Sequence, residues 1–338
     1  MNRIVSYFLY FLFFALVASY PAGVRAETGE VRIAKQFGLG YLQMMLMEDQ
    51  KLLEKQAKAM GLAEVKVNWS TFRSSDVMND ALLSGNLDFA CLGTNGLATI
   101  WAKTRGTTLE VKAASGFNFM PLALVTRDSN IKSLSDYTDK HRIAVPAVKV
   151  SNQAILLQME AAKLYGQSNY TRFDPLTVTM THPDAMTALL SGAGEISSHF
   201  ASAPFLQKEM EKPGLRKIIT STEILGSPFS FNLIATTTKF YTANPKTYAA
   251  FLAALQEATD LINRDKRAAA ELYIRVTKDK SSVEEILKIM NDTGNEYSLV
   301  PKGNMPMVEF LYKIGSIKVK PESWKDLFFP NVHSLPGS

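Results

Sequence analysis

The amino-acid sequence predicts an α/β fold of two lobes, each a mostly parallel sheet flanked by helices. Short apolar strands alternate with amphipathic helices along residues 31–103, and the alternation resumes after residue 120. Such an order is typical of parallel sheets, because a helix carries the chain back between neighbouring strands. An apolar strand at 229–236 is predicted to return to the first block, and the chain beyond residue 26 is long enough for two lobes.

The first block is predicted to contain three strands, each followed by a helix. The runs 31–35 and 65–69 alternate between apolar and polar side chains, whereas 87–92 is almost entirely apolar. Gly61 is expected to end the first helix, and capping residues stand where the next two begin. The expected helices are 41–60, 74–83 and 94–103.

The second block begins with an apolar strand at 120–126 that no helix precedes. Its other strands are expected at 142–145, 176–180, 195–200 and 216–220, and its helices at 151–165, 183–190 and 204–210, with a turn and short helix at 131–136. After the return strand, helices are predicted at 246–263, 267–276 and 282–290, followed by a loose tail from 300 to 338.

This order places the lobe boundaries where the chain crosses from one block to the other. Lobe 1 is expected to contain residues 27–123 and 226–338, and lobe 2 residues 124–225. The hinges are predicted at the two crossings, with Gly226 as a flexible point.

Residues 1–26 have the features of a cleavable secretory signal peptide. Arg3 gives a basic start, an apolar run extends from 4 to 20, and Val24-Arg25-Ala26 places small residues before the cut. The alternative is an uncleaved anchor, but the apolar run is at the lower edge of the length that spans a bilayer. No cysteine stands at the cleavage site after the run, so lipoprotein processing is excluded. The sequence predicts a mature protein that diffuses freely in the periplasm.

Composition and charge exclude several classes of protein. Apolar residues make up 46% of the chain and charged residues 20%, which is typical of a globular protein. The net charge is +5, and it falls to +3 without Arg3 and Arg25 (+5 − 2). Lys and Arg form no basic stripe, so nucleic-acid binding is not expected. The one cysteine, Cys91, lies in an apolar strand and has no second cysteine with which to form an internal disulfide. We expect the protein to be a monomer.

Catalytic and metal-binding motifs are not found in the sequence. The four histidines show neither HxH nor HExxH spacing, and there is no G-x-S-x-G elbow and no phosphate-binding glycine loop. His182 and His199 are interpreted as polar groups of a pocket or as structural groups. We therefore expect a binding protein that uses no cofactor or metal.

The candidate binding residues follow the predicted strands, because ligands in open α/β sheets lie beyond the carboxyl ends of the strands. Thr94 and Asn95 begin one helix there, and Ser151 and Asn152 begin another on the other lobe. Helix N-termini offer free N–H groups and favour anions. Ordinary capping explains each residue alone, but two pairs that face one crevice indicate a ligand role. The cations Arg73 and Lys149 nearby also suggest an acidic group.

Aromatic residues are concentrated in the same predicted loops, which include 115–119. A wall of aromatic side chains suits an organic ligand better than a small hydrophilic ion. The residues are Phe37, Tyr41, Phe72, Phe117, Phe119 and Phe200.

Four stretches of the chain resemble the periplasmic solute-binding proteins of ABC importers in the nitrate/sulfonate/taurine group, which includes thiamine-pyrimidine-like members. They are VRIAKQFG, VKVNWSTFRSSDVMNDALLSGNLDFACLGTNG, MPLALVTRDSNIKSLSDYTDKHRIAVPAVKVSNQAILL and FNLIATTTKFYTANPKTYAAFLAAL. The most recognisable features are the L-x-x-G-x-x-D helix end, the S-x-I-x-S-L-x-D segment and the Ser-Asn helix start. The resemblance covers nearly all of the chain after residue 26.

The resemblance implies a periplasmic-binding-protein type II clamshell that closes on a small molecule and delivers it to a membrane permease with a cytoplasmic ATPase. The ligand-side loops of the family correspond here to Phe37, Gly38, Thr94, Asn95, Ser151 and Asn152. One departure concerns the W-D-P-Y stretch of many members, whose acid serves amine-bearing ligands. Ser202-Ala203-Pro204-Phe205 stands there instead, which makes taurine doubtful, and His199-Phe200 would present an imidazole and a ring.

The expected function is capture of a small organic anion or heterocycle, sulfonate-like or a carboxylate, by hinge closure and without chemistry. Inorganic nitrate is ranked below these ligands. One alternative is a sensor module of the same fold that serves a chemoreceptor or kinase. The other is an enzyme, either a hydrolase or a synthase of the thiamine-pyrimidine type, whose iron is held by a Cys/His-rich set.

Overall fold

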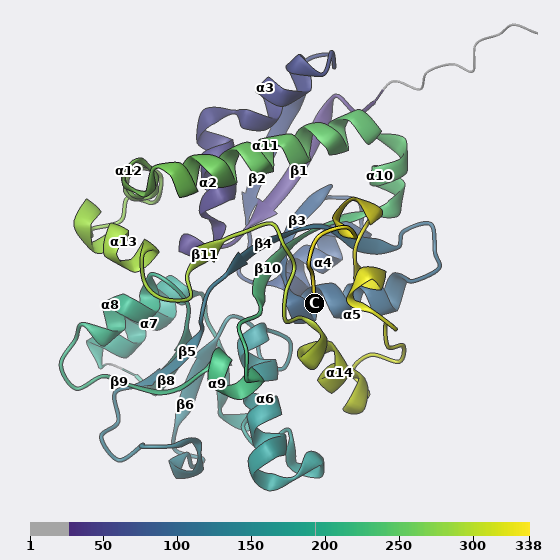
Figure 1. Ribbon diagram of the computed structural model, residues 1–338. Helices are drawn as coiled ribbons and strands as arrows, with labels where there is room; N and C mark the ends of the chain where they lie inside the picture. Colours follow the sequence, from purple (N-terminus) through teal and green to yellow (C-terminus); the bar gives the residue numbers. More distant parts are fainter. Residues whose placement is uncertain (1–26, 193) are drawn as a thin grey trace, which may run out of the picture.

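The computed structural model describes residues 27–192 and 194–338, which form two lobes stacked end to end (Figure 1). Lobe 1, in the upper half of the figure, is built on a six-stranded sheet, and lobe 2 on a five-stranded sheet. Within the described residues, no helix is long and apolar enough to cross a membrane. The predicted signal peptide, 1–26, lies outside them.

Lobe 1 takes its elements from both ends of the described chain. Its N-terminal elements are β1 (Glu30–Lys35), a 3₁₀ turn (Leu39–Tyr41), α2 (Leu42–Gln50), α3 (Leu52–Ala59), β2 (Lys66–Thr71), α4 (Ser75–Leu83), β3 (Phe89–Gly93), α5 (Thr94–Thr104) and β4 (Val111–Phe119). Its C-terminal elements are β10 (Ser230–Thr237), α10 (Thr238–Ala243), α11 (Pro245–Arg264), α12 (Lys266–Thr277), α13 (Val283–Met290), β11 (Glu296–Tyr297) and α14 (Met305–Lys313).

The strand order of this sheet is β11-β4-β10-β3-β1-β2. Strand β1 pairs in parallel with β2, from Glu30 opposite Lys66 to Lys35 opposite Thr71, and also with β3. Strand β10 returns from lobe 2 and lies antiparallel between β3 and β4. All residues of β3 and β10 are buried, which for β3 agrees with its apolar sequence.

Lobe 2 is the continuous middle of the chain. It contains β5 (Ala123–Thr126), β6 (Arg142–Val145), α6 (Asn152–Tyr165), β7 (Thr177–Thr179), α7 (His182–Ser191), β8 (Ile196–Ala201), α8 (Phe205–Met210), β9 (Arg216–Thr220) and α9 (Ser221–Leu225). The strand order is β7-β6-β8-β5-β9, with β6 parallel to β7 and β8, and β5 antiparallel to its neighbours. Both sheets are therefore mixed and not mostly parallel as the sequence predicted, because the strands that cross between the lobes, β5 and β10, run antiparallel to their neighbours. Residues 120–122 and 226–229 connect the lobes, and the hinge role assigned to these crossings stays a prediction.

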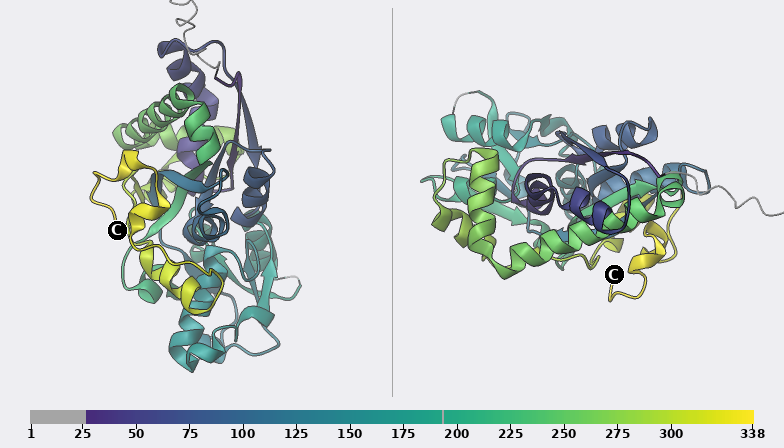
Figure 2. Two further views of the ribbon diagram at one scale, coloured as in Figure 1. Left: turned by 90° about the vertical axis from the view of Figure 1, so that its right-hand side faces the viewer. Right: turned by 90° about the horizontal axis from the view of Figure 1, so that it is seen from above.

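Helix α11 anchors the core of lobe 1 and crosses the top of the molecule (Figures 1 and 2). Its buried residues recur at the three- and four-residue spacing of an amphipathic helix. The ring of Phe251 stacks on Phe89 of β3, with 3.8 Å between ring centroids and 3° between planes. The first described residue also contributes, since the Glu27 carboxylate accepts hydrogen bonds from the N–H groups of Lys246 and Thr247 in the first turn of α11, at 2.8 and 2.6 Å.

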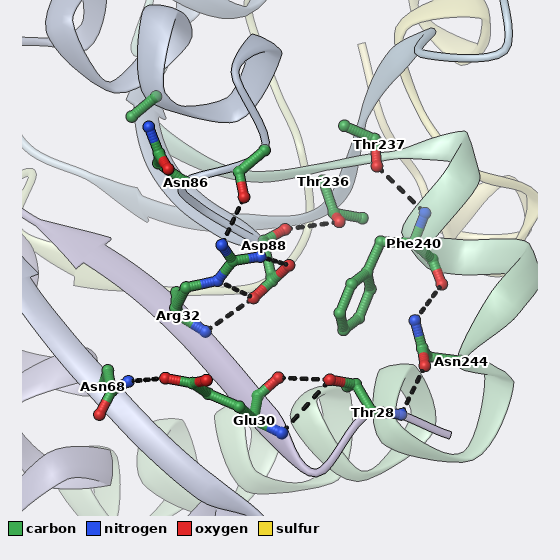
Figure 3. A network of polar contacts seen from close by, with 12 residues as sticks. Thr28, Glu30, Arg32, Asn68, Asn86, Asp88, Thr236, Thr237, Phe240 and Asn244 are labelled. Atoms are coloured by element: carbon green, nitrogen blue, oxygen red, sulfur yellow. Dashed lines mark hydrogen bonds and ion pairs between the residues drawn. The ribbon is translucent and has the colours of Figure 1, made fainter. Parts of the chain in front are cut away.

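A polar network joins three strands at the end of lobe 1 that is remote from lobe 2 (Figure 3). The Arg32 guanidinium of β1 donates to both oxygens of Asp88, with N–O distances of 2.9 and 3.0 Å. The Thr236 hydroxyl of β10 donates to the carbonyl of Asp88 at 2.6 Å. These contacts fix the amino ends of β1 and β3 relative to β10.

Three sequence expectations about the elements are corrected by the structure. The helix predicted at 41–60 is divided at Lys51, which has the left-handed φ of 52° and separates α2 from α3. Residues 115–119 belong to strand β4 and not to a loop. The strand was missed because β4 is buried along most of its length, so no alternation of apolar and polar residues marks it. The tail from 300 contains α14, which contacts α5 of lobe 1 and α6 of lobe 2.

Candidate functional site

A small cavity lies between the lobes, at the carboxyl ends of parallel strands from both sheets. Twelve described residues line it. Those from lobe 1 are Gln36, Tyr41, Ser74, Ser75, Gly93, Phe231 and Asn232, and those from lobe 2 are Pro146, Ser151, Asn152, Gln153 and His182. The cavity volume is about 20 Å³, room for one water-sized group. In this conformation the lobes touch beside the site, where hydrogen bonds of Asn152 and of Leu39 join them.

Four helices begin at the cavity wall. Residue Ser74 precedes α4, Gly93 precedes α5, Ser151 precedes α6, and His182 is the first residue of α7. The Ser151 hydroxyl accepts a hydrogen bond from the N–H of Ala154 at 3.3 Å, and thereby caps its own helix. Four helix N-termini on one cavity give it a positive potential, because each carries a partial positive charge.

The side chains of the wall are uncharged and most of them are polar. None of the twelve described residues that line the cavity is Asp, Glu, Lys or Arg. Burial, together with the neighbouring His199, lowers the pKa of His182 well below its ordinary value, so His182 is neutral at pH 7. Burial raises the pKa of Tyr41, whose hydroxyl donates to Asn232 Oδ1 at 3.1 Å. The wall therefore offers neutral hydrogen-bond groups, and no carboxylate opposes an anion there.

Asn152 bridges the lobes beside the cavity. Its Oδ1 accepts from the N–H of Asn95 at 3.2 Å, and its Nδ2 donates to the carbonyl of Phe231 at 3.0 Å. Asn95 in turn donates from its side chain to the carbonyl of Val150. The carboxamide of Asn152 lies directly against Gly93, where a Cβ atom would be 2.6 Å from Nδ2.

A second bridge lies at the loop after β1. The N–H of Leu39 donates to the carbonyl of Ala203 at 3.1 Å. Gly38 has a φ of 99°, and a Cβ atom there would be 2.7 Å from the same carbonyl oxygen. The residues Ser202-Ala203-Pro204-Phe205, which depart from the family pattern, are thus part of the contact between the lobes.

An ion pair closes the lobes further from the cavity. Lys208 Nζ of α8 lies 2.5 and 2.7 Å from the carboxylate oxygens of Asp279, in the connection between α12 and α13. Burial alone would raise the pKa of Asp279, but Lys208 and the N–H of Ser281 outweigh it and lower that pKa. The stabilisation that Asp279 contributes is therefore complete above the pKa of an aspartate in the unfolded chain, about 3.9. It is lost as the pH falls through the lower pKa of Asp279 in the folded state.

Replacing this pair should weaken closure moderately. We expect Lys208→Met to raise the solute dissociation constant about twofold to fivefold, since partly exposed ion pairs contribute about 1 kcal/mol or less. Isothermal titration calorimetry at pH 7 measures the change. Lys212→Met is the control, because Lys212 is exposed on the same lobe. Equal constants for both variants would show that the pair has no role in closure.

A chain of buried groups leads from the cavity into lobe 2. His182 Nδ1 lies 2.8 Å from His199 Nε2, and His199 Nδ1 lies 2.6 Å from Glu209 Oε1. His182 Nε2 lies 3.3 Å from the side-chain nitrogen of Gln153. His199 itself is 1% exposed and reaches the cavity only through His182.

The structure brings three of the predicted binding residues, Tyr41, Ser151 and Asn152, to the cavity wall. Asn95 lies beside the wall, in the bridge that Asn152 makes between the lobes, and Gly38 lies in the second bridge. The hydroxyl of Thr94 forms its hydrogen bonds within lobe 1, to the carbonyl of Ser230 and to Asn304. The others do not line the cavity. Phe117 and Phe200 are fully buried in the core, Phe37 is 36% exposed, and Phe72 is half-buried. Arg73 and Lys149 do not line it either.

Several wall residues were missed or not assigned to the site from the sequence. Phe231 and Asn232 belong to the return strand β10, and no local signal shows that a strand from the C-terminal half reaches the cavity. Gln153 follows the Ser-Asn helix start, and its position in the first turn of α6 was the available signal. Gln36 follows β1, in a loop that the strand-end rule identifies.

No group of three or more His, Cys, Asp or Glu side chains within 27–192 and 194–338 could hold a metal ion. A hollow of about 490 Å³ lies beside the Arg32–Asp88 network (Figure 3). It lies at the amino ends of β1 and β3, where ligands of open α/β sheets are not expected.

Comparison with solved structures confirms the fold. The alkanesulfonate-binding protein SsuA from Xanthomonas axonopodis pv. citri, bound to MOPS, superimposes with a TM-score of 0.65 at 15% identity, covering 86% of this chain and 95% of that one. The periplasmic nitrate-binding protein NrtA from Synechocystis PCC 6803 gives 0.64 at 14% identity, over 89% and 84%. The ligand-binding component of an ABC-type import system from Staphylococcus aureus, with zinc bound, gives 0.64 at 14% identity, over 90% and 97%.

Similarity at these identities concerns the fold, and it bears out the predicted two-lobed α/β architecture. No curated protein matches the sequence significantly. A family model does: that of the NMT1-like family matches residues 25–276. The chain therefore belongs to the NMT1-like family.

Proposed function

We propose that this protein is the solute-binding component of an ABC import system, which works in the periplasm and captures a small organic anion between its lobes. The observation that carries the proposal is the convergence of four helix N-termini on a cavity whose described wall residues are all uncharged. Such an arrangement stabilises an anion through partial charges and N–H groups. The similar proteins named above include binders of a sulfonate and of nitrate, which supports the same class.

The proposed solute carries a sulfonate or carboxylate group. Its anionic oxygens would occupy the small cavity, and its organic part would lie against the rings of Tyr41 and Phe231 in the cavity wall. The cavity in this conformation holds only one small group. A larger solute therefore needs a few side chains to move and the lobes to open. Binding then shifts the balance between open and closed lobes by contacting both at once.

The test begins with the solute that accompanies the protein. The chain is secreted to a bacterial periplasm, purified without denaturation, and the small molecules released by heat are identified by mass spectrometry. Thermal unfolding is then measured with methanesulfonate, acetate, nitrate and an uncharged pyrimidine. We expect a sulfonate or carboxylate to raise the midpoint, since a ligand at a hundredfold its dissociation constant stabilises by about 2.7 kcal/mol.

Other outcomes decide between the alternatives. Stabilisation by nitrate alone would mean that the solute is an inorganic anion and not an organic one. Stabilisation by the pyrimidine alone would contradict the proposed anion site. Conversion of the captured molecule into a product would show an enzyme, and capture without transport by a co-expressed permease and ATPase would favour a sensor.

A further inference from the structure

The four helix N-termini at the cavity are not equally open to a solute. The Ser151 hydroxyl caps the first turn of α6, and the Thr181 hydroxyl caps that of α7 by accepting from the N–H of Asp184 at 3.3 Å. At α5, the N–H of Asn95 donates to Asn152 Oδ1, which belongs to the other lobe. Three of the four helices therefore already have a side-chain acceptor at their first turn.

Helix α4 has no such cap in the described chain. Ser74 stands at its N-cap position, but the Ser74 hydroxyl donates to the Asp76 carboxylate and accepts from no N–H group of the first turn. The first N–H groups of a helix have no partner within the helix, so those of α4 are left for a solute. Asp76 does not line the cavity, and its carboxylate lies 4.0 Å from Arg73 Nη2, which offsets its charge.

Ser75, the first residue of α4, adds a hydroxyl donor to the same wall. Its Oγ accepts from the N–H of Gly93 at 3.0 Å, and its proton is donated to no described residue. A hydroxyl has one donor and two acceptor positions. Ser75 can therefore donate to a solute without losing its contact with Gly93.

Gln36 provides an independent observation at this wall. It follows β1, lines the cavity and is only 9% exposed, and its carboxamide forms no hydrogen bond with any described residue. Native structures rarely leave a buried polar group without a partner. The other three carboxamides of the wall, those of Asn152, Gln153 and Asn232, all have partners. Gln36 is thus the wall carboxamide whose partner remains to be supplied.

We propose that Gln36, the Ser75 hydroxyl and the uncapped end of α4 form the subsite for the anionic oxygens of the solute, with Gln36 as a specificity-determining residue. Its carboxamide, the hydroxyl and the first-turn N–H groups all donate, which suits a sulfonate or carboxylate and not an ammonium group. Strand β1 and helix α4 both belong to lobe 1 (Figure 1). The anionic group therefore binds lobe 1, and lobe 2 closes over the rest of the solute. The inference rests on the proposed function for the class of solute.

The first test uses methanesulfonate as the probe in isothermal titration calorimetry. Gln36→Met keeps the length of the side chain and removes its donors, so it should raise the dissociation constant about tenfold or more. Without solute, its thermal midpoint should not fall, because no hydrogen bond of the protein is lost. Gln50→Met is the matched control, since Gln50 is exposed at the end of α2. Equal dissociation constants for Gln36→Met and the control would overturn the inference.

A second variant tests whether Gln36 meets the charge of the solute directly. Gln36→Glu should weaken methanesulfonate binding about a hundredfold or more at pH 7, because like charges then face each other. Methanesulfonate stays ionised at about pH 4, whereas the introduced carboxyl gains a proton near its ordinary pKa of about 4.3. Most of the loss, measured against the unsubstituted protein at the same pH, should therefore be recovered there. An equal loss at both pH values would contradict the contact.

Two further outcomes separate this inference from the proposed function. A loss for Gln153→Met without one for Gln36→Met would assign the contact to lobe 2, which would overturn the inference and leave the proposed function standing. Failure of the unsubstituted protein to bind either methanesulfonate or acetate would contradict the proposed function, and the subsite with it.

Discussion

Replacing Gly93 with alanine is expected to weaken solute binding about tenfold or more. A Cβ atom at this position would lie 2.6–2.8 Å from three atoms of the Asn152 carboxamide, which belongs to the other lobe. The backbone at Gly93 is extended, with a φ of −70°, so alanine causes no strain within lobe 1. The added methyl group therefore opposes only the closure of the lobes. Overpacking of this kind costs about 1–3 kcal/mol. Calorimetry with the solute identified by mass spectrometry measures the loss.

A double-mutant cycle separates this clash from other effects. Asn152→Ala removes the carboxamide and its two bonds across the lobes, and it should weaken binding about tenfold by itself. Adding Gly93→Ala to Asn152→Ala should then cost little more, because the methyl group no longer meets a side chain. Additive losses in the cycle would show that Gly93 acts through something other than its contact with Asn152.

Phe89→Ala is expected to destabilise the protein by about 3–5 kcal/mol, the usual range for a fully buried phenylalanine. Phe89 is 0% exposed and contacts three aromatic rings, those of Phe240, Tyr248 and Phe251. Its loss leaves a cavity between β3 and α11, which the neighbouring rings cannot fill without leaving their own positions. Urea unfolding followed by circular dichroism measures the change.

The matched control for this substitution is Leu164→Ala. Leu164 is 46% exposed in α6, so its truncation should change the free energy of unfolding by less than about 0.5 kcal/mol. A loss for Phe89→Ala no larger than that of the control would mean that α11 does not depend on the stacked rings.

The sequence was most informative where local chemistry and structure coincide. Ser151 and Asn152 could be placed at the site because a capping residue after a parallel strand marks both a helix start and the crevice. Phe117 and Phe200 could not be placed, because an apolar residue near a strand end has the same local pattern whether it faces a cavity or the core. Only the strand partners of β4 and β8 decide that question.

Long-range contacts account for the other differences. Strand β10 delivers Phe231 and Asn232 to a cavity whose remaining wall comes from residues before 183, and sequence distance hides this contribution. The division of the first helix at Lys51 was equally hidden, since lysine favours helices and nothing nearby signals a left-handed residue. The order of the lobes, by contrast, followed from the alternation of strands and helices alone.

Because the Glu27 carboxylate accepts hydrogen bonds from the first turn of α11, the position at which the signal peptide is cut affects the stability of the fold. Cleavage after Ala26, as the sequence predicts, leaves the Glu27 carboxylate on the first turn of the longest described helix. Cleavage one residue later would remove that cap, and losses of this kind cost about 0.5–2 kcal/mol. The position of cleavage would then also determine part of the free energy of unfolding of the processed chain.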